Sequence, residues 1–396
     1  MLAQRPPMGW NSWNTFGGAI NEQVVRDTAD AIVEKGLKDA GYEYVVIDDC
    51  WSLRERDPET KRIVADPEKF PSGMKALADY VHSKGLKFGM YSCAGTRTCA
   101  GYPGSFDYEF IDAKTFAEWG VDFLKYDFCY KPGLANGPIL YNRMGMALKA
   151  SGREILFSAC NWGSDEVEKW IRSTGAHMYR STGDINDSFE SFKNIAMSQV
   201  NSERVDQVLL RDNKLVTRTI DRGAKLAYSG PGCYNDIDML IVGMRGKGNV
   251  ANGGCSDIEY RTHFALWCLF QSPLMIGGDL SKIDDVNLEL LKNKELLAIN
   301  QDEEARPPMK LGWGDHPIFF KHLANGEYAL AFFNFSDRDG GADVEFYDLG
   351  LTVGAGYGFK FRDIFTGEDM GVKTGHMSTG IPAHDCRIFR GTLVEL

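Results

Sequence analysis

The chain has 396 residues, of which 43% are hydrophobic and 12% aromatic, which excludes a largely disordered protein. Its length fits a barrel of roughly 250 residues together with a second domain. The formal net charge of −11 argues against nucleic acids and anionic membranes as partners, and it favours an uncharged ligand.

The N-terminus and the cysteines bear on location. Residues Met1–Pro7 contain no apolar segment typical of a secretory signal, and no run of 18 apolar residues predicts a membrane span. The nine cysteines are scattered and include no Cys-x-x-Cys pair, so they form neither a zinc pattern nor a dense disulfide framework. We therefore expect a cytoplasmic protein with no metal or other cofactor, although a signal already removed would leave the same N-terminus.

The predicted elements begin with a strand near Met8–Trp10. Asn21 is a good N-cap for a helix whose apolar residues recur at helical spacing, and a short apolar strand follows at Tyr44–Ile47. The same order of helix, glycine and strand then recurs. The remaining elements are helices at Met74–Ser83 and Ala113–Trp119 and strands at Lys87–Tyr91, Val121–Tyr126, Glu154–Ser158, His177–Arg180, Ala224–Tyr228 and Pro273–Ile276.

About eight strand-then-helix units result, which is typical of an α/β fold of the (β/α)8 TIM-barrel type. A doubly wound sheet is the alternative, but no Gly-x-Gly-x-x-Gly motif opens the first helix. Beyond about residue 305 the chain has short β runs, at Pro317–Lys321, Tyr328–Asn334 and Gly358–Arg362, without helical periodicity. The sequence therefore predicts a barrel at 1–304 and a small antiparallel β-sandwich at 305–396, packed closely against it.

Several of the predicted strands end on acidic side chains. In Leu124-Lys125-Tyr126-Asp127 the alternation of a strand places Lys125 and Asp127 on one face and Tyr126 on the other. A cation beside a carboxylate keeps it ionised, as a nucleophile requires. Such acids are also common as helix N-caps in these loops. Several convergent carboxylates without a metal-binding pattern nevertheless favour a sugar-cleaving enzyme.

Six motifs, spread in order over nearly the whole chain, resemble those of the α-galactosidases of glycoside hydrolase family 27. They are Pro6-Pro7-Met8-Gly9-Trp10-Asn11-Ser12-Trp13-Asn14, Asp48-Asp49-Cys50-Trp51, Lys125-Tyr126-Asp127, Thr182-Gly183-Asp184-Ile185, Asn235-Asp236-Ile237-Asp238-Met239-Leu240 and Ile299-Asn300-Gln301-Asp302. The resemblance implies a (β/α)8 barrel followed by an antiparallel β-domain, and retaining hydrolysis of terminal α-linked galactose without a metal.

The resemblance also implies the catalytic pair, with Asp127 as nucleophile and Asp184 as acid/base. Retention requires the two carboxyl groups to lie about 5–5.5 Å apart. Asp184 is expected to hold a proton at the working pH while Asp127 is ionised. On spacing alone, Asp187 in the same loop is an alternative acid.

The remaining site residues are likewise implied by similarity. Asp48 and Asp49 are expected to accept hydrogen bonds from the 4- and 6-hydroxyls of the sugar, and Trp13 to form an apolar platform. Cys160 and Trp162 are expected to leave room for a 2-hydroxyl but not for an N-acetyl group. The other expected pocket residues are Trp51, Tyr91, Cys99, Lys125, Asn161, Arg180 and Asp238, whereas Trp10 is expected in the core and Asp236 in a structural role.

The sequence departs from the family pattern at several positions. Asn161 stands where a Glu is usual, Cys93 where an Asp is usual, and Cys233-Tyr234 replaces Gly-Trp. Cys99 and Cys129 fall where the family commonly forms a disulfide, which a cytoplasm would keep reduced. The stretch from about Asn201 to Arg222 is longer than expected, and we expect an exposed insertion that shapes the acceptor subsite or an oligomer contact.

The sequence thus predicts an exo-acting α-galactosidase that acts on oligosaccharides, with no nucleic acid or membrane as partner. On the same scaffold, α-N-acetylgalactosaminidase and β-L-arabinopyranosidase are alternatives, separated by the residues near the 2-position and near Asp49. An alternative of another class is a catalytically silent galactose-binding protein. The presence of both Asp127 and Asp184 argues against it.

Overall fold

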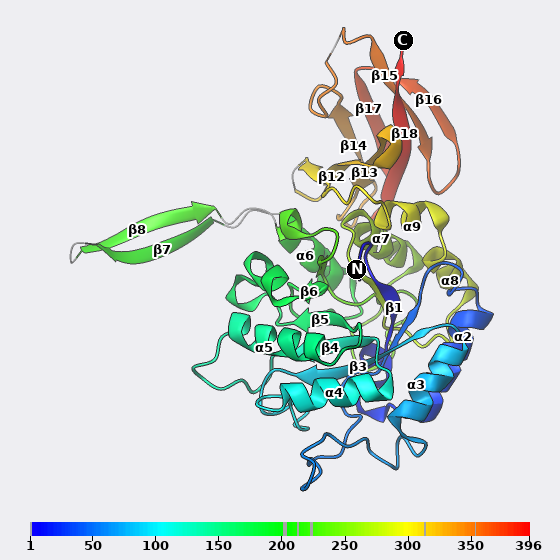
Figure 1. Ribbon diagram of the computed structural model, residues 1–396. Helices are drawn as coiled ribbons and strands as arrows, with labels where there is room; N and C mark the ends of the chain where they lie inside the picture. The colour runs from blue at the N-terminus through cyan, green and yellow to red at the C-terminus, as the bar shows by residue number, and fades with distance from the viewer. Residues whose placement is uncertain (1, 201–203, 212–213, 222–224, 313, 353) are drawn as a thin grey trace.

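The computed structural model describes residues 2–396 except 201–203, 212–213, 222–224, 313 and 353. Eight parallel strands form one sheet in the order β10-β1-β2-β3-β4-β5-β6-β9, and a bridge between Leu240 and Ile276 closes it (Figure 1). This is the predicted barrel. Its strands are β1 (Met8–Asn11), β2 (Tyr44–Val46), β3 (Lys87–Cys93), β4 (Phe123–Asp127), β5 (Leu156–Cys160), β6 (Met178–Arg180), β9 (Tyr234–Asp236) and β10 (Leu274–Ile276).

The strands are buried on both faces, as parallel sheets require. Within β4, Leu124 and Tyr126 belong to the large core between the sheet and the helices. Phe123 instead belongs to a smaller cluster inside the barrel, together with residues such as Tyr44 and Met178. The alternation therefore directs Phe123, Lys125 and Asp127 inward, as the sequence predicted.

Helices cover the outside of the barrel. The predicted N-cap Asn21 is confirmed, because its side chain accepts a hydrogen bond from the Val24 amide. Between β5 and β6 two short 3₁₀ helices, Ser164–Lys169 and Ile171–Thr174, replace an α-helix. The α-helices are α1 (Trp13–Phe16), α2 (Glu22–Glu34), α3 (Gly73–Ser83), α4 (Glu109–Trp119), α5 (Gly137–Ala150), α6 (Phe189–Val200), α7 (Asp257–Leu269), α8 (Asp285–Leu291) and α9 (Lys294–Asn300).

The expected strand at Ala224–Tyr228 is wrong. Lys225–Tyr228 forms a single 3₁₀ turn, Ala224 lies outside the described residues, and the seventh barrel strand is β9, which pairs with β6. A short apolar run does not by itself distinguish a strand from a helical turn. Pairing with the neighbouring strand decided the position of β9.

The long stretch between α6 and β9 contains a hairpin of β7 (Arg204–Arg211) and β8 (Lys214–Asp221). These two strands form a separate two-stranded sheet, and Figure 1 shows the hairpin projecting away from the barrel. It is inserted in a helix-to-strand connection, between α6 and β9. A contribution to an acceptor subsite or an oligomer contact stays a prediction.

The C-terminal part is the predicted antiparallel β-sandwich. A six-stranded sheet in the order β11-β12-β13-β18-β15-β16 faces a two-stranded sheet of β14 and β17 across an apolar cluster that includes Phe320 and Phe359. Its strands are β11 (Met309–Leu311), β12 (Ile318–His322), β13 (Glu327–Phe333), β14 (Gly340–Glu345), β15 (Tyr357–Asp363), β16 (Asp369–Lys373), β17 (His376–Ile381) and β18 (Cys386–Glu395).

The other face of the six-stranded sheet packs against the barrel, which confirms the expected close contact of the two domains. Phe319 of β12 belongs to the same continuous core as the barrel helices, and its ring lies 5.3 Å from that of Phe270. The Nζ of Lys321, fully buried beside it, donates to the side chain of Gln271 at 2.9 Å. Among the described residues, no helix is long and apolar enough to cross a membrane.

Because Phe319 joins the two domains, we expect Phe319→Ala to lower the free energy of unfolding by about 3–5 kcal/mol, through the lost apolar burial and the cavity left behind. Guanidinium unfolding monitored by tryptophan fluorescence measures this. Tyr357→Ala, at an exposed position of the same domain, should change it by less than about 0.5 kcal/mol. Equal effects of the two variants would contradict the packing described.

Candidate active site

The C-terminal ends of the barrel strands surround a pocket. Its lining residues are Trp13, Asn14, Asp48, Asp49, Tyr91, Cys99, Lys125, Asp127, Cys160, Trp162, Arg180, Asp184, Asp238, Met239 and Val250. A larger groove of about 610 Å³ lies beside α5, but Glu154 is the one acidic residue lining it. Several carboxylates converge only in the first of these two, at the end of the barrel where TIM-barrel enzymes place their active sites.

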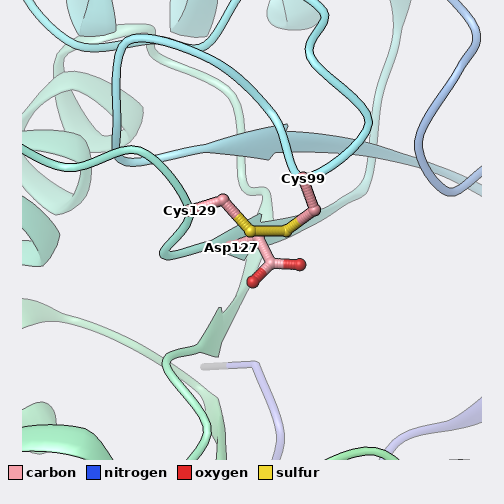
Figure 2. Close-up of side chains that lie close together, drawn as sticks. All are labelled: Cys99, Asp127 and Cys129. Atoms are coloured by element: carbon pink, nitrogen blue, oxygen red, sulfur yellow. A yellow bond between two sulfur atoms is a disulfide. The ribbon is translucent and has the colours of Figure 1, made fainter.

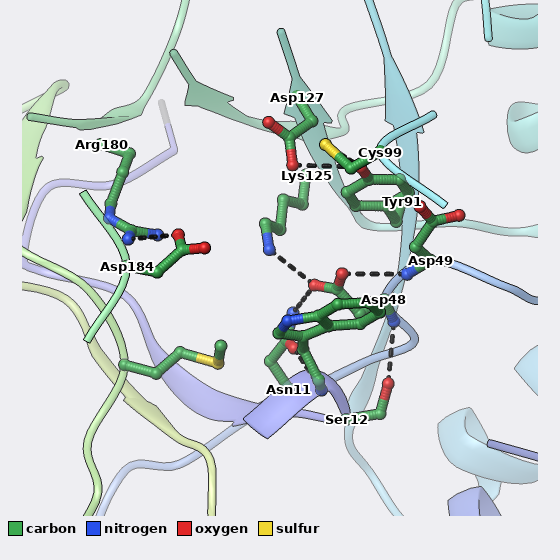
Figure 3. A network of polar contacts seen from close by, with 12 residues as sticks. Asn11, Ser12, Asp48, Asp49, Tyr91, Cys99, Lys125, Asp127, Arg180 and Asp184 are labelled. Carbon is green, nitrogen blue, oxygen red and sulfur yellow. Dashed lines mark hydrogen bonds and ion pairs between the residues drawn. The ribbon is translucent and has the colours of Figure 1, made fainter. Parts of the chain in front are cut away.

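Asp127, the candidate nucleophile, ends β4 and is 6% exposed. Its Oδ2 accepts a hydrogen bond from the Tyr91 hydroxyl at 3.0 Å (Figure 3). Its Oδ1 accepts one from the Phe128 amide at 2.9 Å. Burial raises the pKa of Asp127 to about 6, while the nearby charge of Lys125 and these hydrogen bonds oppose the rise. The carboxyl group is therefore fixed in orientation and ionised above about pH 6.

Lys125 has a different direct partner from the one expected. Its Nζ lies 2.7 Å from Oδ2 of Asp48, which also accepts a hydrogen bond from the side chain of Asn11 at 2.8 Å. Within the described part of the chain, no ion pair joins Lys125 to Asp127. Lys125 points into the barrel as predicted, but its long side chain reaches across to β2, so its effect on Asp127 acts through space.

Asp48 and Asp49 follow β2 and are both nearly fully buried. Asp49 accepts hydrogen bonds from the amides of Cys50, at 2.7 Å, and Ala100, at 2.9 Å. Burial raises the pKa of Asp49. The next α-helix after this pair begins only at Gly73, so neither residue is a helix N-cap. Both instead present polar atoms to the pocket, as expected for hydroxyl-binding groups.

Asp184, the candidate acid/base, lies in the loop after β6, and Figure 3 shows it on a different side of the pocket from Asp127. Its Oδ1 accepts a hydrogen bond from Arg180 at 2.9 Å, and Arg180 also forms an ion pair with Asp238 at 2.6 Å. The side chain of Asp184 is 75% exposed. The nucleophile candidate is thus buried and the acid candidate exposed, so the burial that raises a carboxyl pKa acts on Asp127, the group that was expected to be ionised.

Two other acids near the site have structural partners. Asp187, the alternative acid, is fully buried and accepts hydrogen bonds from the Gly246 amide at 2.6 Å and from the Tyr260 hydroxyl at 3.0 Å. It does not line the pocket. Asp236 accepts the amide of Asp238 at 2.9 Å, in agreement with its expected structural role.

The residues after β5 only partly match the expectation for the 2-position of the sugar. Cys160 is buried at the pocket wall, and Trp162 is 37% exposed with a left-handed backbone conformation, φ 60°. Asn161 is fully buried, does not line the pocket, and donates to the carbonyl of Ser164 at 2.8 Å. The presence of Asn161 in place of the usual Glu therefore affects how the loop is supported, and not the surface that the loop presents to the pocket.

Trp51 was expected in the pocket but lies behind it. Its side chain is 2% exposed, its indole nitrogen donates to the Tyr91 carbonyl at 2.9 Å, and its ring packs edge-on against Trp119 at 5.9 Å. Trp10 is fully buried, as predicted. The pocket also contains three residues that sequence reasoning missed, namely Asn14, Met239 and Val250. Asn14 and Met239 lie within the quoted motifs, which is a signal that could have found them, whereas no motif contains Val250.

The disulfide implied by the resemblance is present beside the candidate nucleophile. Cys99 and Cys129 are bonded, with Cα atoms 5.2 Å apart, and Figure 2 shows the bond next to Asp127. Because the two sulfurs are bonded to each other, this cluster offers no pair of thiolates to a metal. Cys93 remains a thiol and donates to the Cys129 carbonyl at 3.2 Å. Disulfides persist mainly in oxidising compartments, so the expected cytoplasmic location stays a prediction that this bond does not support.

The disulfide joins positions 30 residues apart, and a cross-link of this span stabilises a fold by about 2–4 kcal/mol. A dithiol reductant should therefore lower the melting temperature of the wild-type protein, as measured by circular dichroism. The double variant Cys99→Ser/Cys129→Ser should start lower and show no response to reductant. A wild-type melting temperature that is insensitive to reductant, with free thiols detected at both positions, would contradict the bond.

The buried carboxylate of Asp127 should destabilise the fold. Its folded-state pKa of about 6 lies above the unfolded value of 3.8, so the ionised form costs stability at pH 7, and this cost disappears as the pH falls below about 4. We expect Asp127→Asn to raise the free energy of unfolding by about 1–3 kcal/mol at pH 7 and by little at pH 4. Urea unfolding at both pH values measures this, with the exposed Asp184→Asn as control, and a destabilised Asp127→Asn at pH 7 would refute the expectation.

A family model described as Alpha galactosidase A matches residues 5–302, and one described as Alpha galactosidase C-terminal beta sandwich domain matches residues 314–390. An α-galactosidase of Cyamopsis tetragonoloba is 42% identical over 390 residues, which cover 98% of this chain and 86% of the relative. α-Galactosidase A of Cellvibrio japonicus is 41% identical over 399 residues, covering 98% and 92%. The crystal structure of α-galactosidase I from Mortierella vinacea superimposes with a TM-score of 0.83 at 36% identity, covering 98% and 97%. With both domains matched and this identity over nearly its whole length, the chain belongs to the α-galactosidase family of glycoside hydrolases, family 27, and is an enzyme of that class.

Proposed function

We propose that the protein is a retaining exo-α-galactosidase that removes terminal, non-reducing α-D-galactosyl units from oligosaccharides. The observation that carries this proposal is that Asp127 and Asp184 line one pocket from different sides, in a chain about 40% identical to α-galactosidases. The inward-facing Phe123 of β4 belongs to a cluster that fills the barrel below the pocket. A sugar chain therefore cannot pass through the pocket, which fits removal of a terminal unit.

In the first step, a carboxylate oxygen of Asp127 attacks the anomeric carbon, and the bond from that carbon to the glycosidic oxygen breaks. Asp184 transfers its proton to the departing oxygen, so the leaving group is a neutral alcohol. The hydrogen bonds from Tyr91 and Phe128 orient the attacking carboxylate. They also hold Asp127 in place before the sugar arrives, which lowers the entropic part of the barrier.

In the second step, water attacks the same carbon and displaces Asp127, while the now ionised Asp184 takes a proton from that water. Two inversions give net retention, and both carboxyl groups return to their starting states. The side chain of Asp184 is exposed, and a bound sugar with its leaving group would cover it. Removing water from this carboxyl favours the neutral form that the first step uses.

Recognition of galactose is proposed to depend on Asp48, Asp49 and Lys125. Lys125 and Asp48 hold each other through their ion pair, and the amides of Cys50 and Ala100 hold Asp49, so all three groups are pre-oriented for sugar hydroxyls. A buried polar pocket rejects the wrong epimer because its own donors and acceptors are then left unpaired. At the 2-position, the side chains of Cys160 and Trp162 favour a hydroxyl over the larger N-acetyl group.

Hydrolysis of three nitrophenyl glycosides tests the proposal. We expect the α-galactoside to be cleaved at least about 100-fold faster than the α-N-acetylgalactosaminide or the β-L-arabinopyranoside, judged by kcat/KM. Asp127→Asn should lower the α-galactoside activity by at least about 10⁴-fold, since an amide cannot act as the nucleophile.

Each contrary result has a distinct meaning. Preference for one of the other two sugars would show that the pocket near Cys160 or Asp49 is misread. Near-native turnover by Asp127→Asn would refute the mechanism. If none of the three glycosides is cleaved, while galactose still binds, the protein is a silent galactose-binding member of the family.

A further inference from the structure

The position of Asp184 depends on its loop rather than on its own contacts. Its side chain is 75% exposed, and the hydrogen bond from Arg180 is the side-chain contact that holds it. The loop that carries it runs from Ser181 to Ser188, between β6 and α6. A general acid must be held within hydrogen-bonding distance of the leaving oxygen, so whatever fixes this loop controls proton transfer.

Besides the hydrogen bonds from Arg180 to Thr182 and Gly183, two anchors within the barrel hold the first part of the loop. The amide of Ile185 donates to Oδ2 of Asp238 at 2.7 Å, next to the pocket. Two residues later, the buried carboxylate of Asp187 accepts hydrogen bonds from Gly246 and Tyr260. Both anchors lie before Ser188, so they leave the far end of the loop to be fixed by other contacts.

The far end is held by the C-terminal domain. Phe189, the first residue of α6, stacks face to face on the ring of His384, with centroids 3.8 Å apart and planes inclined by 8°. A second ring of that domain, Phe335, lies edge-on to Phe189 at 6.2 Å. The β-sandwich thus touches the chain only five residues after Asp184.

Polar contacts to both domains hold His384 in place. Its Nδ1 lies 2.7 Å from Glu259 of α7, and its Nε2 lies 2.9 Å from Asp337 of the C-terminal domain. Its carbonyl accepts a hydrogen bond from Thr262 at 2.7 Å. Its backbone has φ 59°, a conformation that persists where surrounding contacts impose it.

We propose that His384 and Phe189 are positioning residues for the acid/base, through which the C-terminal β-sandwich fixes the Asp184 loop. The inference rests on the proposed function, in which Asp184 protonates the leaving group. It gives the second domain a part in the reaction although none of the residues described in that domain lines the pocket.

The proposal predicts a loss that depends on the leaving group. A poor leaving group, such as the methoxide of methyl α-galactoside, requires protonation, whereas the dinitrophenolate of 2,4-dinitrophenyl α-galactoside leaves without it. For His384→Ala and Phe189→Ala we expect kcat/KM, which reports the first displacement, to fall at least about tenfold on the methyl glycoside. On the dinitrophenyl glycoside it should fall less than about threefold. A general structural defect would lower both equally.

Three further variants complete the experiment. Phe189→Tyr keeps a ring for stacking and should stay within about threefold of wild type on both substrates. Arg362→Gln removes a different contact between the domains, the ion pair with Glu295 at 2.8 Å, and should show no dependence on the leaving group. Asp184→Ala should show the same dependence as His384→Ala, in stronger form. Melting temperatures establish that each variant is folded.

The possible failures are distinguishable. If Asp184→Ala is selective but His384→Ala and Phe189→Ala reduce both substrates equally or neither, the positioning role is wrong and the proposed function stands. If Asp184→Ala itself lacks selectivity, its assignment as acid fails, and the positioning role fails with it. Selectivity in all three alanine variants and in neither control supports the proposal.

Discussion

The ion pair between Lys125 and Asp48 is the interaction on which the pocket depends. Five carboxylates, from Asp48, Asp49, Asp127, Asp184 and Asp238, share the space with two cations. Lys125 neutralises one side of this set, and Arg180, paired with Asp184 and Asp238, neutralises the other. Without these cations, burial and mutual repulsion would drive protons onto the carboxylates, and neither a charged nucleophile nor oriented acceptors would persist.

Strained backbone also occurs at and beside the pocket. Asp238 has φ 89°, Cys50 has φ 72° and Trp162 has φ 60°, values that residues with side chains rarely adopt. Each costs of the order of 1–3 kcal/mol, and the barrel can sustain this because its strands are packed on both faces. Buried charge and strained backbone thus occur together at the strand ends, while the strands that support them are regular and apolar.

The C-terminal domain packs against the barrel and contacts the helix that follows the Asp184 loop. Its six-stranded sheet shares one core with the barrel through Phe319. Arg261 of α7 also forms a bidentate ion pair with Asp385. The adjacent residue, His384, reaches the start of α6. The same interface therefore stabilises the fold and borders the loop that carries Asp184, so its packing and the placement of the candidate acid are physically linked.

The amino-acid sequence by itself determined the class of fold and most of the pocket. Alternation along β4 was sufficient to turn Lys125 and Asp127 inward and Tyr126 outward, because strand geometry is local. Parallel strands in a barrel end at one rim, so acids at strand ends could be expected to converge. The contacts between segments that are distant in the sequence were decided only by the tertiary structure. Lys125 bonds to Asp48 rather than to Asp127, Trp51 lies behind the pocket, and β9 rather than the segment at 224–228 completes the barrel. Each of these depends on which side chain or strand from elsewhere in the chain occupies the neighbouring space, and no local pattern of residues records that.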